Sequence, residues 1–86
     1  MATIIRVDGS EEKLENVSLD LLQKAVGGYI ESLPMGDGRT LIFNEEGKLE
    51  GLPRNRKATT MVHLFPGDFI AGNAVICTEE ELNREE

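Results

Sequence analysis

The chain has 86 residues, of which 40% are hydrophobic and 29% are charged. A chain of this length predicts one folded domain, and this balance of apolar and charged residues argues against disorder. Sixteen acidic against nine basic residues give a formal charge of −7 at pH 7. That charge disfavours direct binding to nucleic acid or to an anionic membrane surface.

The cysteine content and the apolar runs indicate the compartment. Cys77 is the one cysteine, so an internal disulfide is excluded. Residues 1–12 have no basic region and no long apolar stretch, unlike a signal peptide. No run approaches the roughly 20 apolar residues of a membrane span. We therefore expect a cytoplasmic protein.

The first half of the chain predicts a strand, a helix and a hairpin. Residues 3–7 are short and β-branched, which favours a strand. Ser18 is a suitable N-cap for a helix whose apolar residues recur at helical spacing until Gly27, where glycine ends it. Residues 29–33 and 39–43 flank a glycine-rich turn and predict a β-hairpin.

The second half predicts another helix and another strand. Residues 54–64 place apolar side chains at helical spacing from Ala58 onward, which indicates a helix. Residues 69–77 are almost continuously apolar and predict a buried strand with a bulge at Gly72 and Asn73.

The predicted fold is α+β, with the order β-α-β-β-α-β. The simplest arrangement is a sheet of about four strands with both helices packed on one face, and residues 12–17 could add a short strand. Residues 1–77 form this single domain. Residues 78–86 are an acidic tail or short helix, opened by a capping-box pattern between Thr78 and Glu81.

The chain has no recognisable catalytic or metal-binding set. Cys77 and His63 could pair if the strand and the helix pack together, although both residue types are more often packing residues in such positions. One Cys and one His cannot form a zinc site within a monomer. The turn at Glu45 and Glu46 lacks the alternating oxygen ligands of a calcium loop. We expect no metal, no cofactor and no catalytic residue.

A basic cluster, formed by Arg54, Arg56 and Lys57, interrupts the acidic chain. It lies at the start of the second predicted helix, where backbone N–H groups favour an anion, and Asn55 could cap that helix. One interpretation is a site for a small anion such as a nucleotide. The other is a solvated helix start whose cations pair with nearby carboxylates.

Three segments carry a resemblance to a known family: VGGYIE at 26–31, NEEGKLEGLPRNRKAT at 44–59 and FIAGNAVI at 69–76. The chain resembles a family from bacteriophages, plasmids and bacterial mobile elements that is described only as a domain of unknown function. The resemblance spans roughly residues 19–77 and implies a mobile-element origin without an established activity. The best-matching positions are Gly27, Gly28, Tyr29, Asn44, Glu45, Gly47, Asn55, Ala58 and Gly72.

The leading hypothesis is a non-enzymatic accessory protein that binds a host protein or a small anionic ligand. One alternative is an acidic mimic that inhibits a host nucleic-acid-binding protein through Glu45, Glu46 and the C-terminal acids. Another is a small enzyme that uses Cys77 and His63. A homodimer is a further expectation, because small sheets often pair through an open edge. The candidate ligand-binding residues are Arg54, Asn55, Arg56, Lys57, Tyr29 and Asn44.

Overall fold

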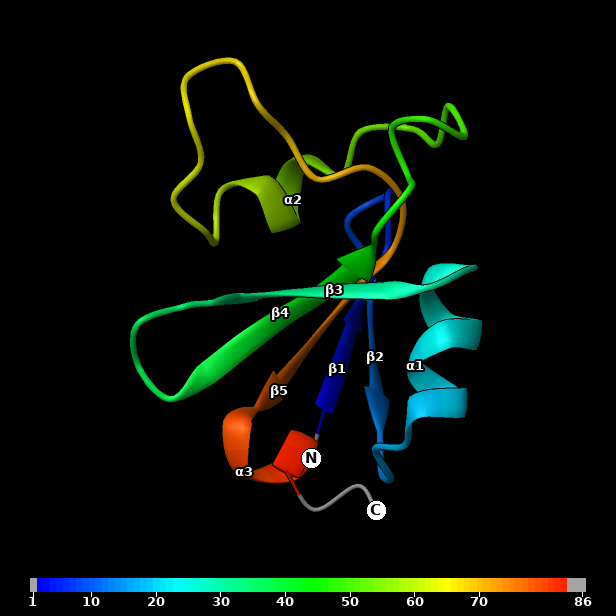
Figure 1. Cartoon of the computed structure of the whole chain (residues 1–86), viewed down its shortest axis with the longest axis vertical. Coiled ribbons are helices and arrows are strands. Elements are labelled where there is room, and N and C mark those ends of the chain that lie inside the picture. Colours follow the sequence, from blue (N-terminus) through cyan, green and yellow to red (C-terminus); the bar gives the residue numbers. More distant parts are fainter. Residues whose placement is uncertain (1, 84–86) are drawn as a thin grey trace.

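The computed structural model describes residues 2–83, and this part forms a five-stranded antiparallel sheet with three helices (Figure 1). The strand order is β2-β1-β5-β4-β3, so the first and last strands of the chain are neighbours. The elements are β1 (Ala2–Ile5), β2 (Glu11–Leu14), α1 (Leu19–Val26), β3 (Ile30–Pro34), β4 (Arg39–Asn44), α2 (Arg56–Thr59), β5 (Ala74–Thr78) and α3 (Glu79–Asn83).

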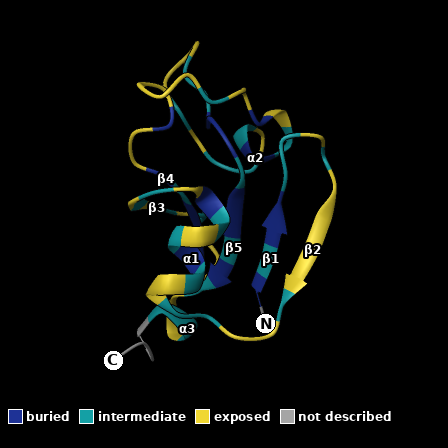
Figure 2. Ribbon diagram, turned by 90° about the vertical axis from the view of Figure 1, so that its right-hand side faces the viewer, coloured by how far each residue is buried: buried dark blue, intermediate teal, exposed yellow. Residues whose placement is uncertain are grey.

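The sheet buries side chains on both faces. Ile4 and Val75 pack with Leu22 of α1 on one face, whereas Ile5 packs with Ala58 of α2 on the other. Neighbouring residues of a strand point to opposite faces, so consecutive apolar residues supply two cores. Figure 2 shows β1 and β5 as largely buried and β2 as exposed. The prediction that both helices cover one face is wrong, because α1 and α2 lie on opposite faces.

The first helix agrees with its sequence signals. Ser18 Oγ accepts a hydrogen bond from Leu21 N at 3.2 Å, which satisfies one N–H group at the helix start. Gly27 adopts the left-handed conformation, with φ of 84°, and its N–H donates to Gln23 O at 2.8 Å. This is a glycine C-cap, as predicted.

The sheet has five strands rather than the predicted four or so, because the N-terminal hairpin supplies β2. Residues 11–14 form β2 and pair with β1 in antiparallel register, with Ile4 opposite Glu12. The tight turn is closed by Arg6 N–H, which donates to Ser10 O at 2.9 Å. The charged side chains of β2 hide the alternating apolar pattern that normally indicates a strand. The sequence therefore predicted no more than a short additional strand over 12–17.

The second helix is much shorter than the predicted 54–64, since α2 ends at Thr59. Two threonine hydroxyls compete with the helical hydrogen bonds: Thr59 Oγ1 donates to Asn55 O and Thr60 Oγ1 to Lys57 O, both at 2.7 Å. Met61, Val62 and Leu64 then pack on the core of the α2 side from a loop rather than from a helix face.

The last predicted strand also begins later than expected. Regular pairing starts at Ala74, and within residues 69–73 the sheet-type pairing is limited to an isolated bridge between Arg54 and Ala71. Gly72 has φ of 85° and turns the chain out of the sheet. Residues 69–73 therefore belong to a loop, and the predicted strand over 69–77 is shortened to Ala74–Thr78 rather than bulged at Gly72 and Asn73.

The capping box at the C-terminal end of β5 is confirmed. Glu81 N–H donates to Thr78 Oγ1 at 3.0 Å, and Thr78 N–H donates to Glu81 Oε1 at 2.8 Å. The helix α3 follows, and Leu82 packs against the core on the α1 side. Residues 84–86 of the predicted acidic segment lie outside the described residues. No helix in the described part is long and apolar enough to cross a membrane.

Candidate functional site

An apolar groove lies on the α2 side of the sheet, between β3, β4 and the long loops that follow β4 and α2. It encloses a volume of about 770 Å³. Ligand sites in proteins commonly have volumes in this range. The lining residues, which define the apolar groove, are Glu31, Leu33, Phe43, Asn44, Glu45, Lys48, Leu49, His63, Leu64, Phe65, Pro66, Asp68, Phe69, Ile70 and Ala71.

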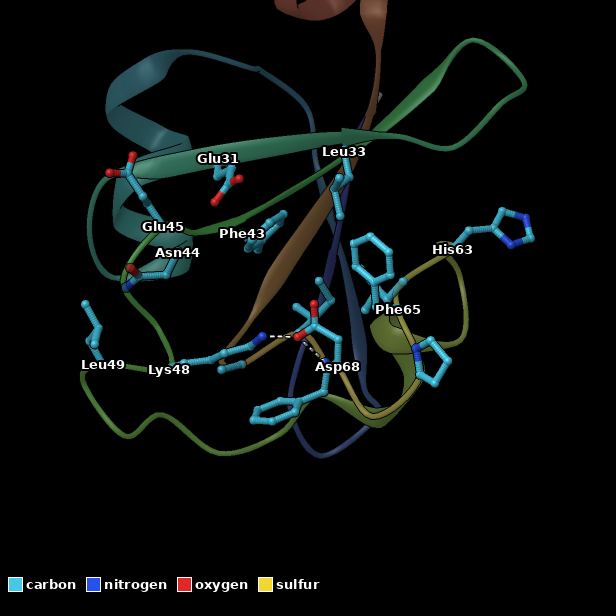
Figure 3. Close-up of a pocket in the computed structure, with 15 residues that line it drawn as sticks. Glu31, Leu33, Phe43, Asn44, Glu45, Lys48, Leu49, His63, Phe65 and Asp68 are labelled. Carbon is cyan, nitrogen blue, oxygen red and sulfur yellow. Dashed lines mark hydrogen bonds and ion pairs between the residues drawn. The ribbon is translucent and has the colours of Figure 1, made fainter.

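The strands supply one wall of the apolar groove through their side-chain alternation. Glu31 and Leu33 are two residues apart on β3, and Phe43 of β4 is the register partner of Glu31. Side chains at these positions point to the same face of the sheet. Figure 3 shows them directed into the space that Phe65 borders from the opposite loop.

Two large apolar side chains at the mouth of the groove are exposed to solvent. Phe65 is 85% exposed and Leu49 is 87% exposed. They belong to different loops and flank the groove in Figure 3. A single exposed apolar residue needs no explanation, but two on either side of one apolar cavity extend its apolar surface toward solvent.

The charged groups at the rim give the groove a negative balance. Glu31, Glu45 and Asp68 contribute carboxylates, against the ammonium group of Lys48. The hydrogen bond from Lys48 Nζ, and a second one from Phe69 N–H, hold the pKa of the Asp68 carboxyl below its usual value of 3.8. Asp68 is therefore ionised at neutral pH and compensated by Lys48. The carboxylates of Glu31 and Glu45 provide the net charge.

Phe69 connects the groove to the basic cluster. Its ring centroid lies 5.0 Å from Lys48 Nζ and 4.5 Å from Arg54 Cζ, within the range of cation–π contacts. Such contacts stabilise a surface site by about 0.5–1 kcal/mol each. Arg54 thus has a local role, which is to hold the base of the groove through Phe69.

Asn44 holds the loop that follows β4. Its buried side chain accepts a hydrogen bond from Glu46 N–H at 2.8 Å and donates to Val26 O and Glu50 Oε1, each at 3.2 Å. These bonds use both ends of the amide and tie the loop to the end of α1. Asn44 lines the groove, and its hydrogen bonds make it a positioning residue for the loop that carries Leu49.

Asn55 plays the same part for the second loop. Its fully buried amide nitrogen donates to Ile5 O at 2.9 Å and Gly72 O at 3.0 Å, while Oδ1 accepts from Ala58 N at 3.0 Å. The backbone N–H of Asn55 also donates to Ile70 O at 2.8 Å. One side chain therefore joins β1, α2 and the loop before β5. It caps α2, as predicted, and is buried away from any ligand at the surface.

The basic cluster is partly engaged within the protein. Lys57 forms an ion pair with Glu11 of β2, and its Nζ lies 3.4 Å from Gly9 O. Arg54 contacts Phe69, and Arg56 is exposed on α2. The Asn55 side chain already occupies one of the N–H groups at the helix start, and α2 has four residues. One cation of the cluster therefore pairs with a carboxylate, and another contacts an aromatic ring.

Tyr29 does not lie with the basic cluster. It is 71% exposed and borders a smaller depression of about 250 Å³ that also contains Gln23, Glu46 and Glu50. This depression lies beside β3, the strand at one edge of the sheet, whereas Lys57 contacts β2 at the other edge. Tyr29 therefore lies at the β3 edge of the sheet and Lys57 at the β2 edge.

The two residues of the enzymatic alternative are also separated. Cys77 is buried in the core on the α1 side, and this burial is the main cause that raises the pKa of its thiol from 9.0 to about 11. His63 is exposed, lines the groove on the opposite face and points away from it in Figure 3. Among residues 2–83, no group of three or more His, Cys, Asp or Glu could hold a metal ion.

The acids of the mimic alternative lie at two ends of the sheet. Glu45 and Glu46 follow β4, whereas the acids of α3 follow β5, whose last residue, Thr78, pairs with Arg39 at the start of β4. Figure 1 shows α3 beside the start of β4 and the loop that follows β4 at the other end of that strand. They do not form one continuous acidic face.

The apolar groove has no counterpart among the sites predicted from the sequence. None of Leu49, Phe65, Lys48 and Asp68 is among the candidate ligand-binding residues predicted from the sequence. The available signal was the placement of large apolar residues beside turn residues, as in Phe65-Pro66-Gly67. A phenylalanine next to such a turn is seldom covered by the core, because loops run over the surface.

Comparison with known proteins places the chain in a family. The family described as a domain of unknown function (DUF3846) matches residues 1–85, and the chain belongs to it. No curated protein and no solved structure matches the chain. The family membership agrees with the resemblance to a domain of unknown function and assigns no activity.

Proposed function

We propose that this member of the DUF3846 family is a non-enzymatic binding protein. Its binding surface is the apolar groove, and its ligand is a segment of a partner protein that carries apolar and positively charged side chains. The observation behind the proposal is the groove itself, an open apolar cavity with Leu49 and Phe65 exposed at its mouth.

Apolar burial supplies the affinity in this proposal. Covering one exposed Phe or Leu side chain contributes about 1.5–3 kcal/mol, and a few such anchors dominate typical protein interfaces. The groove walls are held before binding by Asn44 and Asn55, so a ligand need not order the loops. Such preorganisation strengthens binding, because the entropy cost of ordering the loops does not oppose it.

Charge selects the ligand class. The net negative rim, with Glu31 and Glu45, favours Lys or Arg on the partner and disfavours an anion. This supports the protein-partner form of the leading hypothesis over the nucleotide form. The partial engagement of Arg54 and Lys57 inside the protein supports the same choice.

The biological setting is part of the proposal. The segments at 26–31, 44–59 and 69–76 resemble sequences from mobile genetic elements, which supports an accessory protein that acts on a host protein. A cytoplasmic location fits the single buried thiol of Cys77, since that compartment keeps cysteines reduced.

The proposal can be tested without knowing the partner. An mRNA-displayed library of random linear dodecapeptides is selected on the protein and counter-selected on the Phe65→Ser variant, whose altered side chain is exposed. We expect enriched peptides that combine apolar residues with a net positive charge. Enrichment of acidic peptides, equal enrichment on both proteins, or no enrichment at all would each contradict the proposal.

A further inference from the structure

The outer edge of β3 is open in the described part of the chain, because β3 is the last strand of the sheet order. Met35 N–H donates to Arg39 O and Glu45 N–H donates to Tyr29 O, each at 2.9 Å. In an antiparallel ladder these bonded positions alternate with outward-facing ones. The N–H and C=O groups of the residues between them, Ile30 and Ser32, therefore point away from β4.

The two edges of the sheet differ in how well they are protected. β2 presents EEKL, with three charged side chains in four positions, whereas β3 presents IESLP, with one. Charged side chains on an edge strand discourage pairing with another chain. Pro34 cannot donate a hydrogen bond, so it limits pairing on β3 to the part before it. Ile30 to Ser32 is the stretch suited to an added strand.

The open edge borders the apolar groove. Glu31 and Leu33 point into the groove, while the backbone groups between them face outward. We propose that the partner segment binds as an extra antiparallel strand along β3 and directs alternate side chains into the groove. This inference rests on the proposed function and specifies how the segment binds.

This geometry predicts the pattern of the bound segment. Residues opposite each other on one face of an antiparallel pair have Cβ atoms about 4.5–5.5 Å apart. The partner residue opposite Leu33 is therefore apolar, and the one opposite Glu31 is Lys or Arg. Because the strands are antiparallel, the segment reads apolar–any–basic from its N- to its C-terminus. The central residue faces away from the groove.

Amide hydrogen exchange tests the binding mode with a peptide enriched in the selection described above. We expect bound peptide to slow exchange at Ile30 and Ser32 by at least about tenfold, because both N–H groups gain a partner. If the peptide shifts NMR signals of Leu49 and Phe65 but leaves exchange at Ile30 and Ser32 unchanged, strand addition is overturned and the groove proposal stands. If no peptide is enriched, both fail.

Two variants provide a second readout. Ser32→Pro removes an outward N–H from β3, and Lys13→Pro does the same on β2, where Arg6 N–H to Ser10 O sets Lys13 outward. We expect Ser32→Pro to weaken the peptide at least about tenfold and Lys13→Pro to leave it unchanged. Equal affinity of the two variants would overturn the inference.

A charge exchange serves if either proline variant fails to fold. Glu31→Lys should weaken the selected peptide, and a peptide with Glu in place of its Lys or Arg should recover the lost affinity. If the peptide with Glu does not recover affinity for Glu31→Lys, the predicted pairing of Glu31 with a basic residue of the segment is wrong. Slowed exchange at Ile30 and Ser32 that depends on protein concentration without peptide would mean that a second copy of the chain occupies the edge, and this would also overturn the inference.

Discussion

At the scale of single residues, two buried asparagines shape the candidate site. Asn44 and Asn55 hold the two loops that wall the groove, and each uses its amide oxygen and nitrogen in hydrogen bonds to backbone groups. Buried polar side chains are tolerated when they are satisfied in this way. Their role is to position the apolar residues that would contact a partner.

Asn55→Ala should lower the free energy of unfolding by about 2–4 kcal/mol, because Ile5 O, Gly72 O and Ala58 N each lose their hydrogen bond to the side chain. Urea unfolding measures this change. Asn16→Ala, at an exposed position, is the matched control and should change stability by less than about 0.5 kcal/mol. An equal effect of the two substitutions would contradict the assigned role.

Cys77 should make stability depend on pH in the alkaline range. Burial raises the pKa of the folded thiol to about 11, while the unfolded thiol ionises near 9.0. The unfolded state therefore loses its proton first, and stability that is fully present below pH 9 declines as the pH rises through 11. The decline attributable to Cys77 is about 2 kcal/mol by pH 11.

The measurement compares the unfolding free energies of the wild type and Cys77→Ala from pH 8 to 11. The wild type should lose more stability than the variant over this range, since the variant lacks the thiol. Parallel curves would show that the thiol is not desolvated in the folded state.

At the scale of elements, the sequence predicted what local signals determine. Ser18 and Gly27 bounded α1 correctly, and Thr78 marked the start of α3. The extent of α2 could not be predicted, because threonine hydroxyl contacts and the bridge from Arg54 to Ala71 depend on tertiary structure. The groove was not predicted for the same reason, because loops form the walls that face β3 and β4.

A proline scan distinguishes the short α2 from the predicted helix over 54–64. His63→Pro should lower stability by less than about 1 kcal/mol, because His63 is exposed and lies beyond the end of α2. Lys24→Pro, at an exposed position inside α1, should lower it by about 3 kcal/mol or more. Equal losses of stability for the two variants in thermal or urea unfolding would show that the helix extends over 54–64, as first predicted.

At the scale of the whole molecule, two cores flank a five-stranded sheet, and the loops on one side leave a cavity. Near-continuous apolar runs such as VIC at 75–77 are typical of strands covered on both faces, so this arrangement has a sequence signature. The α1 side is closed by α1 and by Leu82. The α2 side carries only a single-turn helix and loops, which leaves room for a partner.

We propose that Phe65 and Leu49 of the apolar groove contact the partner segment. Isothermal titration of the selected peptide into the wild type, Phe65→Ser, Leu49→Ser and Leu19→Ser tests it most directly. Leu19 is the control, because it is an exposed apolar residue of α1 on the other face of the sheet. We predict affinities at least about tenfold weaker for Phe65→Ser and Leu49→Ser and unchanged for Leu19→Ser. Equal affinities across all four proteins would contradict the claim.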